Sequence, residues 1–193
     1  RDEATGLVFV IMKYLEGDTL DRVIRDQAPQ GMPFKQAFSL IQAMGQALSY
    51  AHQQGIVHLD FKPANVFVCR NGDIKVLDFG IASVLSHATT EAEQTLFRVS
   101  DLGALTPAYA SPEMLEAHVK KRAHVADVRD DVYSFACVVY EVLTGSHPFG
   151  RASATDARRA GLVAKAPKGL SLRQGKTLMK ALAFSQAQRL ASV

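Results

Sequence analysis

Three short polar clusters in the sequence could carry chemistry, and each lies where an apolar run gives way to a loop. They read HLDFKPAN at residues 58–65, DFG at residues 78–80 and SPE at residues 111–113. Asp60 and Asn65 are five residues apart, and Asp78 follows thirteen residues after Asn65. Carboxylate and amide oxygens are hard ligands that suit Mg²⁺, which takes few protein ligands and completes its shell with water and phosphate. A single aspartate after a strand is more often a cap or turn residue. The hypothesis of a magnesium site therefore depends on the three clusters occurring together.

The elements that must position these clusters follow from the spacing of apolar residues. In residues 33–54 apolar side chains recur every three or four positions, which predicts a long amphipathic helix that Gly55 ends. Apolar runs at residues 66–68 and 74–77 are joined by Asn-Gly-Asp at residues 71–73, a strong signal for a β-hairpin. One long helix followed by a hairpin departs from a repeating strand–helix–strand pattern.

Weaker patterns predict the elements on either side. Residues 7–15 favour a buried strand and residues 16–18 a turn, followed by a short helix with an apolar face. Residues 83–105 are polar and weakly periodic, which indicates a long loop of the kind that is more often functional than filler. Residues 132–143 are apolar on nearly all sides, which predicts a buried helix.

The last part of the sequence combines a helix with a surplus of positive charge. Residues 172–184 favour a final helix. Its expected inner face consists of Leu172, Leu178, Ala181 and Leu182. Between residues 151 and 176, seven basic side chains stand against the single acid Asp156. Charged residues are mostly exposed, so we expect a solvated face here rather than a docking site.

Composition excludes several classes of protein. The 193 residues are 48% hydrophobic and 21% charged, which excludes collagen-like, low-complexity and wholly disordered chains. The 22 basic and 19 acidic residues give a net charge of +3, too balanced to indicate a nucleic-acid binder. The most apolar stretch, residues 132–140, is well short of the roughly 20 residues of a membrane span. Cys69 and Cys137 lack metal-type spacing, so we expect inert cysteines in a reducing, cytoplasmic setting.

Taken together and in this order, the clusters resemble the C-terminal lobe of a protein kinase. That lobe carries a catalytic loop H-R-D-x-x-x-x-N, followed by D-F-G and then A-P-E. DVYSFACVVYEVLTGSHPF at residues 131–149 resembles the buried central helix of the lobe. VIMKYLEGDTL at residues 10–20 resembles the strand and hinge between the lobes. The segments DFGIA, HPF and ALAFSQAQRLASV are similar to those of bacterial eukaryotic-like (Hanks-type) serine/threonine kinases.

The resemblance implies a fold and a division of the chain. We expect a mainly α fold with a small β-hairpin, which is the C-lobe of the α+β kinase fold with most of the N-lobe absent. Residues 1–17 would be the last N-lobe strand and the hinge, and residues 18–193 the C-lobe, with an activation segment at about 78–113. The sequence contains neither a Gly-rich phosphate loop nor a V-A-I-K lysine, so it resembles a piece of a kinase. Such a piece should be nearly inactive alone, and its exposed lobe interface should favour self-association.

The resemblance also implies roles for the clustered residues. Asp60 would be the catalytic base that accepts the proton of the substrate hydroxyl, while Asn65 and Asp78 would hold the magnesium ions that bridge the phosphates of ATP. Lys62 would neutralise charge on the transferred phosphoryl group, and a lysine at this position is typical of serine/threonine kinases. Thr106 would contact both Asp60 and Lys62.

The implied cofactors are therefore ATP and Mg²⁺. The adenine of ATP would meet backbone groups around Lys13 and Leu15, with Met12 behind the base. Lys62 would lie beside the phosphates.

Other matches imply structural roles. Asp131 would tie the backbone of the catalytic loop to the central helix, and Glu113 would pair with Arg189. His58 would be a packed core histidine rather than a metal ligand.

Three residues depart from the pattern of the family. Leu59 replaces the arginine that normally binds a phosphate on the activation segment. Regulation by such a phosphate is therefore not expected. Ser111 replaces the alanine of A-P-E, and Leu105 replaces the glycine before Thr106, and both changes are mild.

The leading hypothesis is a serine/threonine protein kinase that transfers the γ-phosphoryl group of ATP to hydroxyls of protein substrates. One alternative is a pseudokinase that acts as a scaffold, but a scaffold has no need of Asp60, Lys62, Asn65 and Asp78 together. A second alternative is a small-molecule phosphotransferase of kinase-like fold. Lys62, Thr106 and the SPE motif instead favour a protein substrate. The expected partners are thus ATP and a protein substrate, with no nucleic acid and no membrane segment in this chain.

Overall fold

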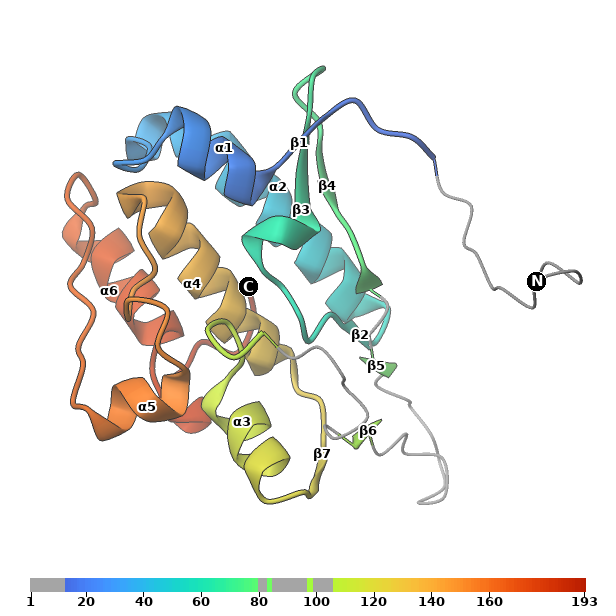
Figure 1. The fold of residues 1–193 in the computed structure, drawn as a ribbon, viewed down its shortest axis with the longest axis vertical. Coiled ribbons are helices and arrows are strands. Elements are labelled where there is room, and N and C mark those ends of the chain that lie inside the picture. Colours follow the sequence, from blue (N-terminus) through green and yellow to red (C-terminus); the bar gives the residue numbers. More distant parts are fainter. Residues whose placement is uncertain (1–12, 80–82, 85–96, 99–105) are drawn as a thin grey trace, which may run out of the picture.

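Helices make up most of the molecule, and small antiparallel sheets lie beside them (Figure 1). The computed structural model describes residues 13–79, 83–84, 97–98 and 106–193. In chain order its elements are β1 (Gly17–Thr19), α1 (Leu20–Gln27), α2 (Phe34–Gln53), β2 (Ile56–Val57), η1 (Pro63–Asn65), β3 (Val66–Cys69), β4 (Ile74–Val76), β5 (Ser83–Val84), β6 (Phe97–Arg98), α3 (Pro112–Val119), β7 (Ala123–His124), α4 (Val128–Thr144), α5 (Ala154–Arg159), α6 (Leu172–Ala181) and η4 (Gln186–Gln188). The expectation of a mainly α fold with a small β-hairpin is confirmed.

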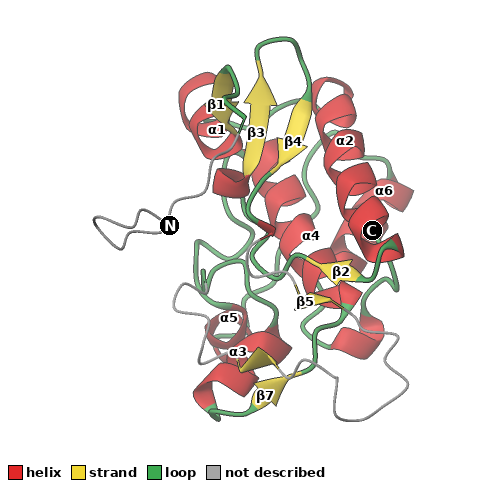
Figure 2. Cartoon of the chain, turned by 90° about the vertical axis from the view of Figure 1, so that its right-hand side faces the viewer, coloured by secondary structure: helices red, strands yellow, loops and turns green. Residues whose placement is uncertain are grey.

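Helix α4 is the centre of this fold. Most of its side chains are buried, and it packs between α2 and α6 (Figures 1 and 2). A capping box between Asp127 and Asp130 closes its N-terminus, and Gly145 ends it with a left-handed φ of 71°. The predicted helix over residues 132–143 is confirmed, and the capping box adds one further turn at its start.

The long helix and the hairpin are also confirmed. Helix α2 occupies the predicted range and buries one stripe of side chains against the core: Ala37, Met44, Leu48 and Ala51. Strands β3 and β4 pair in antiparallel register, with Val66 opposite Val76 and Val68 opposite Ile74. Figure 2 shows this sheet at one end of the molecule and α3, α5 and β7 at the other, with α4 running between the two ends.

The predicted turn at residues 16–18 is wrong. Gly17–Thr19 form β1, which pairs with β3 and extends the hairpin to three strands in the order β1-β3-β4. A Cβ on Gly17 would lie 2.1 Å from the carbonyl oxygen of Val68, so this glycine permits a backbone approach that other residues would prevent. Residues 13–16 are not in a strand, and residues 7–12 of the predicted strand lie outside the described residues.

The inner face predicted for the last helix is wrong at one position. Leu178, Ala181 and Leu182 are buried, but Leu172 is 77% exposed. Leu172 is the first residue of α6, and six helical residues turn it about 120° away from Leu178 around the axis. Its side chain therefore faces solvent.

Two short helices were not predicted from the sequence. Helices α3 and α5 each begin after a serine whose hydroxyl accepts a hydrogen bond from a backbone N–H of the first turn. These caps are Ser111, bonded by Met114, and Ser153, bonded by Asp156. Serine followed by proline and glutamate is a helix-start signal, so the SPE motif contained the evidence for α3.

Further predictions concern the basic residues, the two cysteines and the segment at residues 83–105. All seven basic residues between 151 and 176 are exposed, as both a solvated face and a docking site would require. Cys69 and Cys137 have free thiols, and burial raises the pKa of the Cys137 thiol, which keeps it protonated and unreactive. Within the described ranges, none of the helices is long and apolar enough to cross a bilayer. The predicted loop at 83–105 contains β5 and β6, and its other residues lie outside the described ones.

Replacing Gly145 by alanine should destabilise the fold more than the same change at Gly72. Both glycines have a left-handed φ, 71° at Gly145 and 87° at Gly72, so both variants carry a backbone strain of about 1 kcal/mol. A Cβ at Gly145 would lie 2.2 Å from the Pro29 carbonyl oxygen, whereas a Cβ at Gly72 meets nothing within 4 Å. In urea unfolding, the free energy of unfolding of Gly145→Ala should be lower by at least about 1 kcal/mol than that of Gly72→Ala. Equal values would contradict the close packing at Gly145.

Candidate active site

A buried carboxylate on α4 fixes the loop at residues 58–65. Asp131 accepts hydrogen bonds from the backbone N–H groups of His58 (2.8 Å) and Leu59 (2.9 Å), which confirms the predicted link. Leu59 has a φ of 65°, a left-handed conformation that costs a non-glycine residue energy. The two hydrogen bonds to one carboxylate stabilise this conformation and therefore set the direction in which Asp60 leaves the loop.

Helix α2 contributes a third bond to the same carboxylate. The Nε2 atom of His52 lies 2.7 Å from Oδ2 of Asp131, and both side chains are buried. A buried carboxylate requires such partners because its removal from water is otherwise very unfavourable. His52, Asp131 and the loop backbone thus join α2, α4 and the site.

His58 joins the loop to the end of the hairpin. Its ring is fully buried against Phe61 and Phe79, and its Nε2–H donates to the carbonyl of Leu77 at 2.9 Å. The prediction of a packed core histidine is confirmed. The N–H of Leu77 in turn donates to the carbonyl of Asn65 at 2.8 Å. These bonds bring Asp78, the next residue, to the end of the loop that carries Asn65.

Three side chains donate to the Asp60 carboxylate, and together with Asp60 we call them the Asp60 cluster. Lys62 Nζ lies 2.6 Å from Oδ2, and the Thr106 hydroxyl donates to Oδ1 at 3.1 Å. Lys62 also donates to Thr106 at 2.8 Å. The amide nitrogen of Asn65 donates to Oδ2 of Asp60 at 3.3 Å and to its backbone carbonyl at 2.9 Å. The structure therefore brings together four of the predicted site residues, and Thr106 reaches them from far along the chain.

The donor set fits a magnesium ion held jointly with phosphate. The bonds to Asp60 use the amide nitrogen of Asn65 and leave its oxygen for another partner. Asp78 is exposed and has a left-handed φ of 56°, which turns the backbone directly after Leu77. One carboxylate and one amide oxygen suit Mg²⁺, which usually keeps several waters and binds substrate phosphates. Among the described residues, no group of three His, Cys, Asp or Glu side chains gathers as a metal cluster.

The residues predicted to contact adenine are only partly described. Lys13 and Leu15 lie in the extended segment that leads into β1. Met12 lies outside the described residues.

The turn after Thr106 is held by two buried groups. Its N–H groups at Tyr109 and Ala110 donate back to the Thr106 carbonyl, and the Tyr109 hydroxyl donates to buried Glu141 at 2.5 Å. His147 donates from Nε2 to the Ala108 carbonyl at 2.9 Å. Thr106 is thus positioned by contacts that reach back to α4.

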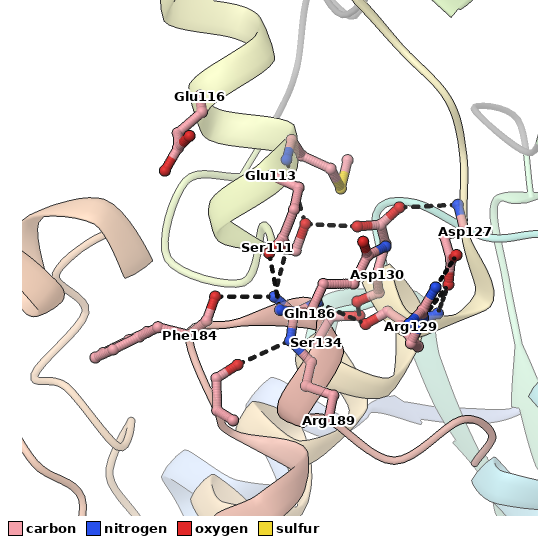
Figure 3. A network of polar contacts seen from close by, with 12 residues as sticks. Ser111, Glu113, Glu116, Asp127, Arg129, Asp130, Ser134, Phe184, Gln186 and Arg189 are labelled. Carbon is pink, nitrogen blue, oxygen red and sulfur yellow. Dashed lines mark hydrogen bonds and ion pairs between the residues drawn. The ribbon is translucent and has the colours of Figure 1, made fainter.

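The helix that follows is fixed by the predicted ion pair. The Arg189 guanidinium lies 2.5 Å from the Glu113 carboxylate and also donates to the backbone carbonyls of Arg129 and Phe184 (Figure 3). Arg189 is buried, so this pair joins the start of α3 to the end of the chain.

Sequence reasoning missed several residues that support the site. His52, Tyr109, Glu141 and His147 belong to no motif that identifies their partners. A histidine in the last turn of a predicted helix is the only signal for His52, and it is equally consistent with a helix-end charge.

Comparisons with known proteins agree with the geometry. Residues 3–184 match the family model of the protein kinase domain, and the chain belongs to this family. It is 38% identical over 143 residues to the serine/threonine-protein kinase PknB of Mycolicibacterium smegmatis, which covers 74% of this chain and 21% of the relative. The PknB kinase of Mycobacterium tuberculosis strain H37Rv is also 38% identical, over 146 residues, with 76% of this chain and 21% of the relative covered.

A third relative extends the comparison to another genus. The probable serine/threonine-protein kinase CE0033 of Corynebacterium efficiens is 36% identical over 147 residues, which covers 76% of this chain and 20% of the relative. The chain therefore spans 20% or 21% of the length of these three relatives. Membership of the family confirms the resemblance drawn from the three clusters and the expected kinase-like fold.

Stability should fall as the pH drops through the range in which His147 resists protonation. Burial lowers the pKa of His147 to about 4, and its Nδ1 already accepts hydrogen bonds from the N–H groups of Phe149 and Arg151. Between about pH 4 and pH 6.5 the histidine of the unfolded chain, with a pKa of about 6.5, binds a proton that the folded protein does not bind. The contribution of His147 to the free energy of unfolding is therefore fully present above pH 6.5 and is lost as the pH falls toward 4.

The measurement is urea unfolding between pH 7 and about pH 4.5, with His147→Gln as the comparison. In the wild type this one group should lower the free energy of unfolding by up to about 1.4 kcal/mol per pH unit, and the variant should lack that part of the slope. Parallel curves for the two proteins would show that His147 does not behave in this way.

Proposed function

We propose that the protein containing this chain is a serine/threonine protein kinase, which transfers the γ-phosphoryl group of ATP to hydroxyl groups of protein substrates. The observation that carries the proposal is the Asp60 cluster, in which a lysine, a threonine hydroxyl and an amide converge on one carboxylate. The relatives are named serine/threonine-protein kinases, which supports the same activity.

Asp60 is the residue that orients the substrate hydroxyl and accepts its proton. A carboxylate offers about four acceptor positions, and here Lys62 and Asn65 bond to Oδ2 while Thr106 bonds to Oδ1. Oδ1 therefore keeps a lone pair for an incoming hydroxyl. The three donors also restrict the rotation of the carboxylate, and such positioning supplies much of the rate in phosphoryl transfer.

Lys62 has two roles in this arrangement. Its contact with Thr106 fixes the ammonium group between the loop and the segment that carries the threonine. The same positive charge, 2.6 Å from Asp60, lies where a phosphoryl group would meet the oriented hydroxyl, and it stabilises the negative charge that develops there.

Asn65 and Asp78 would hold the magnesium ions, and the region of Lys13 and Leu15 would meet the adenine of ATP. When bound, Mg²⁺ neutralises phosphate charge during transfer. In this proposal residues 1–17 form the last N-lobe strand and the hinge, and residues 18–193 form the C-lobe. We extend the proposal to a cytoplasmic setting and to self-association of the face that an N-lobe would cover.

Replacing Asp60 by asparagine in the intact kinase should abolish most of the activity without unfolding the protein. The amide keeps the shape but cannot accept a proton, so kcat for phosphoryl transfer from ATP to a serine/threonine peptide should fall by at least about a hundredfold. The melting temperature should fall by no more than about 4 °C, because Asn keeps the oxygen that accepts from Thr106, and the cost of placing its NH₂ group against Lys62 and Asn65 is limited by the partial exposure of the site.

The matched control is Asp26→Asn, because Asp26 is an exposed aspartate on α1 whose carboxylate accepts hydrogen bonds from the adjacent Arg25. It should keep kcat within about twofold. A scaffold would show no transfer even in the wild type, and a small-molecule phosphotransferase would modify no peptide. Wild-type-like turnover by Asp60→Asn would remove Asp60 from the proposed role.

A further inference from the structure

A second buried carboxylate on α4, next to Asp131, collects three donors of its own. Asp130 accepts from the Ser111 hydroxyl at 2.6 Å, from His124 Nε2 at 2.8 Å and from the Asp127 N–H at 3.0 Å. Figure 3 shows its carboxylate between Ser111 and Asp127. The Asp130 side chain is 0% exposed and that of His124 is 9% exposed. We call these four residues the Asp130 cluster.

Helix capping explains only one of the three bonds. The bond from the Asp127 N–H belongs to the capping box of α4, and a carboxylate at this position is also stabilised by the helix dipole. Ser111 and His124 come from two other segments, so their bonds fix those segments to α4.

Within the segment at residues 78–113, the two bonds act on two of its described parts. Ser111 lies at the end of this segment, just before α3. His124 lies in β7, which pairs with β6 inside the segment, with Phe97 opposite His124 and Arg98 opposite Ala123. One carboxylate thus positions Ser111 directly and β6 through β7.

Position 59 does not supply the usual partner for a phosphate on this segment. Leu59 occupies the position at which the resemblance expects a phosphate-binding arginine, and its side chain is buried and has no hydrogen-bonding atom. A phosphate on this segment would therefore find no guanidinium at position 59, and other contacts have to hold β6 and Ser111 in place. Asp130, Ser111 and His124 are buried, and the bonds of Asp130 reach both Ser111 and β7, which pairs with β6.

We propose that the Asp130 cluster holds β6 and the turn at residues 106–111 in place without a phosphate, with Asp130 and His124 as positioning residues for phosphoryl transfer. The proposal rests on the proposed kinase function. Its effect reaches the Asp60 cluster through a short path, because Ser111 follows the turn whose N–H groups bond to the Thr106 carbonyl. Thr106 in turn contacts Asp60 and Lys62.

The test compares two substitutions of His124 in the intact kinase after phosphatase treatment. His124→Leu removes the N–H donor, whereas His124→Gln keeps an N–H of similar reach. Val125→Ala, at an exposed neighbour of β7, is the control. The readouts are kcat and KM on a serine/threonine peptide, and amide hydrogen exchange at residues 97–98 and in α2.

The proposal expects the treated wild type to remain active. His124→Leu should lower kcat by about tenfold with the KM for ATP within about twofold, because substrate positioning rather than nucleotide binding is disturbed. Exchange at residues 97–98 should accelerate by about tenfold while α2 keeps its protection. His124→Gln should restore both readouts, a rescue that a merely space-filling role for the ring would not give.

Other results would overturn the proposal. These are a tenfold loss of wild-type activity on phosphatase treatment, unchanged exchange at residues 97–98 in His124→Leu, or equal defects in the Leu and Gln variants. If His124→Leu also loses exchange protection in α2, the variant is globally destabilised and Ser111→Ala is tested in its place. A kcat of Ser111→Ala within about twofold of the wild type then rejects the proposed role of the Asp130 cluster. Failure of the kinase function itself is separate: an inactive wild type would reject that function, while the exchange comparison would still decide whether His124 orders β6.

Discussion

The side chain of Asp131 holds the backbone on which the site depends. Its buried carboxylate accepts two consecutive N–H groups from the loop at residues 58–65 and a third hydrogen bond from His52. Those bonds stabilise the strained left-handed conformation of Leu59. Because Asp60 follows Leu59 directly, the direction of its carboxylate is a consequence of this interaction. The lysine, threonine and asparagine that meet Asp60 could not converge on it from a loop of different shape.

Helix α4 carries further buried carboxylates that bond to segments outside the helix. Asp130, Asp131 and Glu141 are all buried, and each is bonded to a segment outside the helix. Asp131 fixes the loop at residues 58–65, Asp130 fixes the start of α3 and β7, and Glu141 accepts the Tyr109 hydroxyl in the turn after Thr106. A buried charge without partners is very unfavourable, so each segment is stabilised in the geometry that supplies hydrogen bonds to its carboxylate. The apolar remainder of α4 supplies the packing between α2 and α6, while its carboxylates determine where the loops go.

The sequence predicts the parts of this molecule whose signals are local. The period of α2, the Asn-Gly turn of the hairpin and the apolar run of α4 each reflect a single element, and all three were predicted correctly. Strand β1 was missed because it forms only by pairing with β3, and Leu172 was misplaced because a terminal helical residue can match the apolar pattern without facing the core. The motifs brought Asp60, Lys62, Asn65 and Thr106 onto one candidate site, and the structure shows that they touch. His52, His124 and Glu141 could not be found in this way, since their partners lie far away in the sequence and no pattern in one chain encodes that pairing.

The most direct test of this account is to replace Asp131 by asparagine in the intact kinase. The substitution keeps the shape but turns one acceptor oxygen into an NH₂ group that faces the N–H donors of the loop. The account predicts that amide exchange at His58 and Leu59 accelerates and that kcat falls by at least about tenfold, while the exchange protection of α2 is largely kept. If kcat and both exchange rates stay within about twofold of the wild type, the loop does not depend on this carboxylate and the account is contradicted.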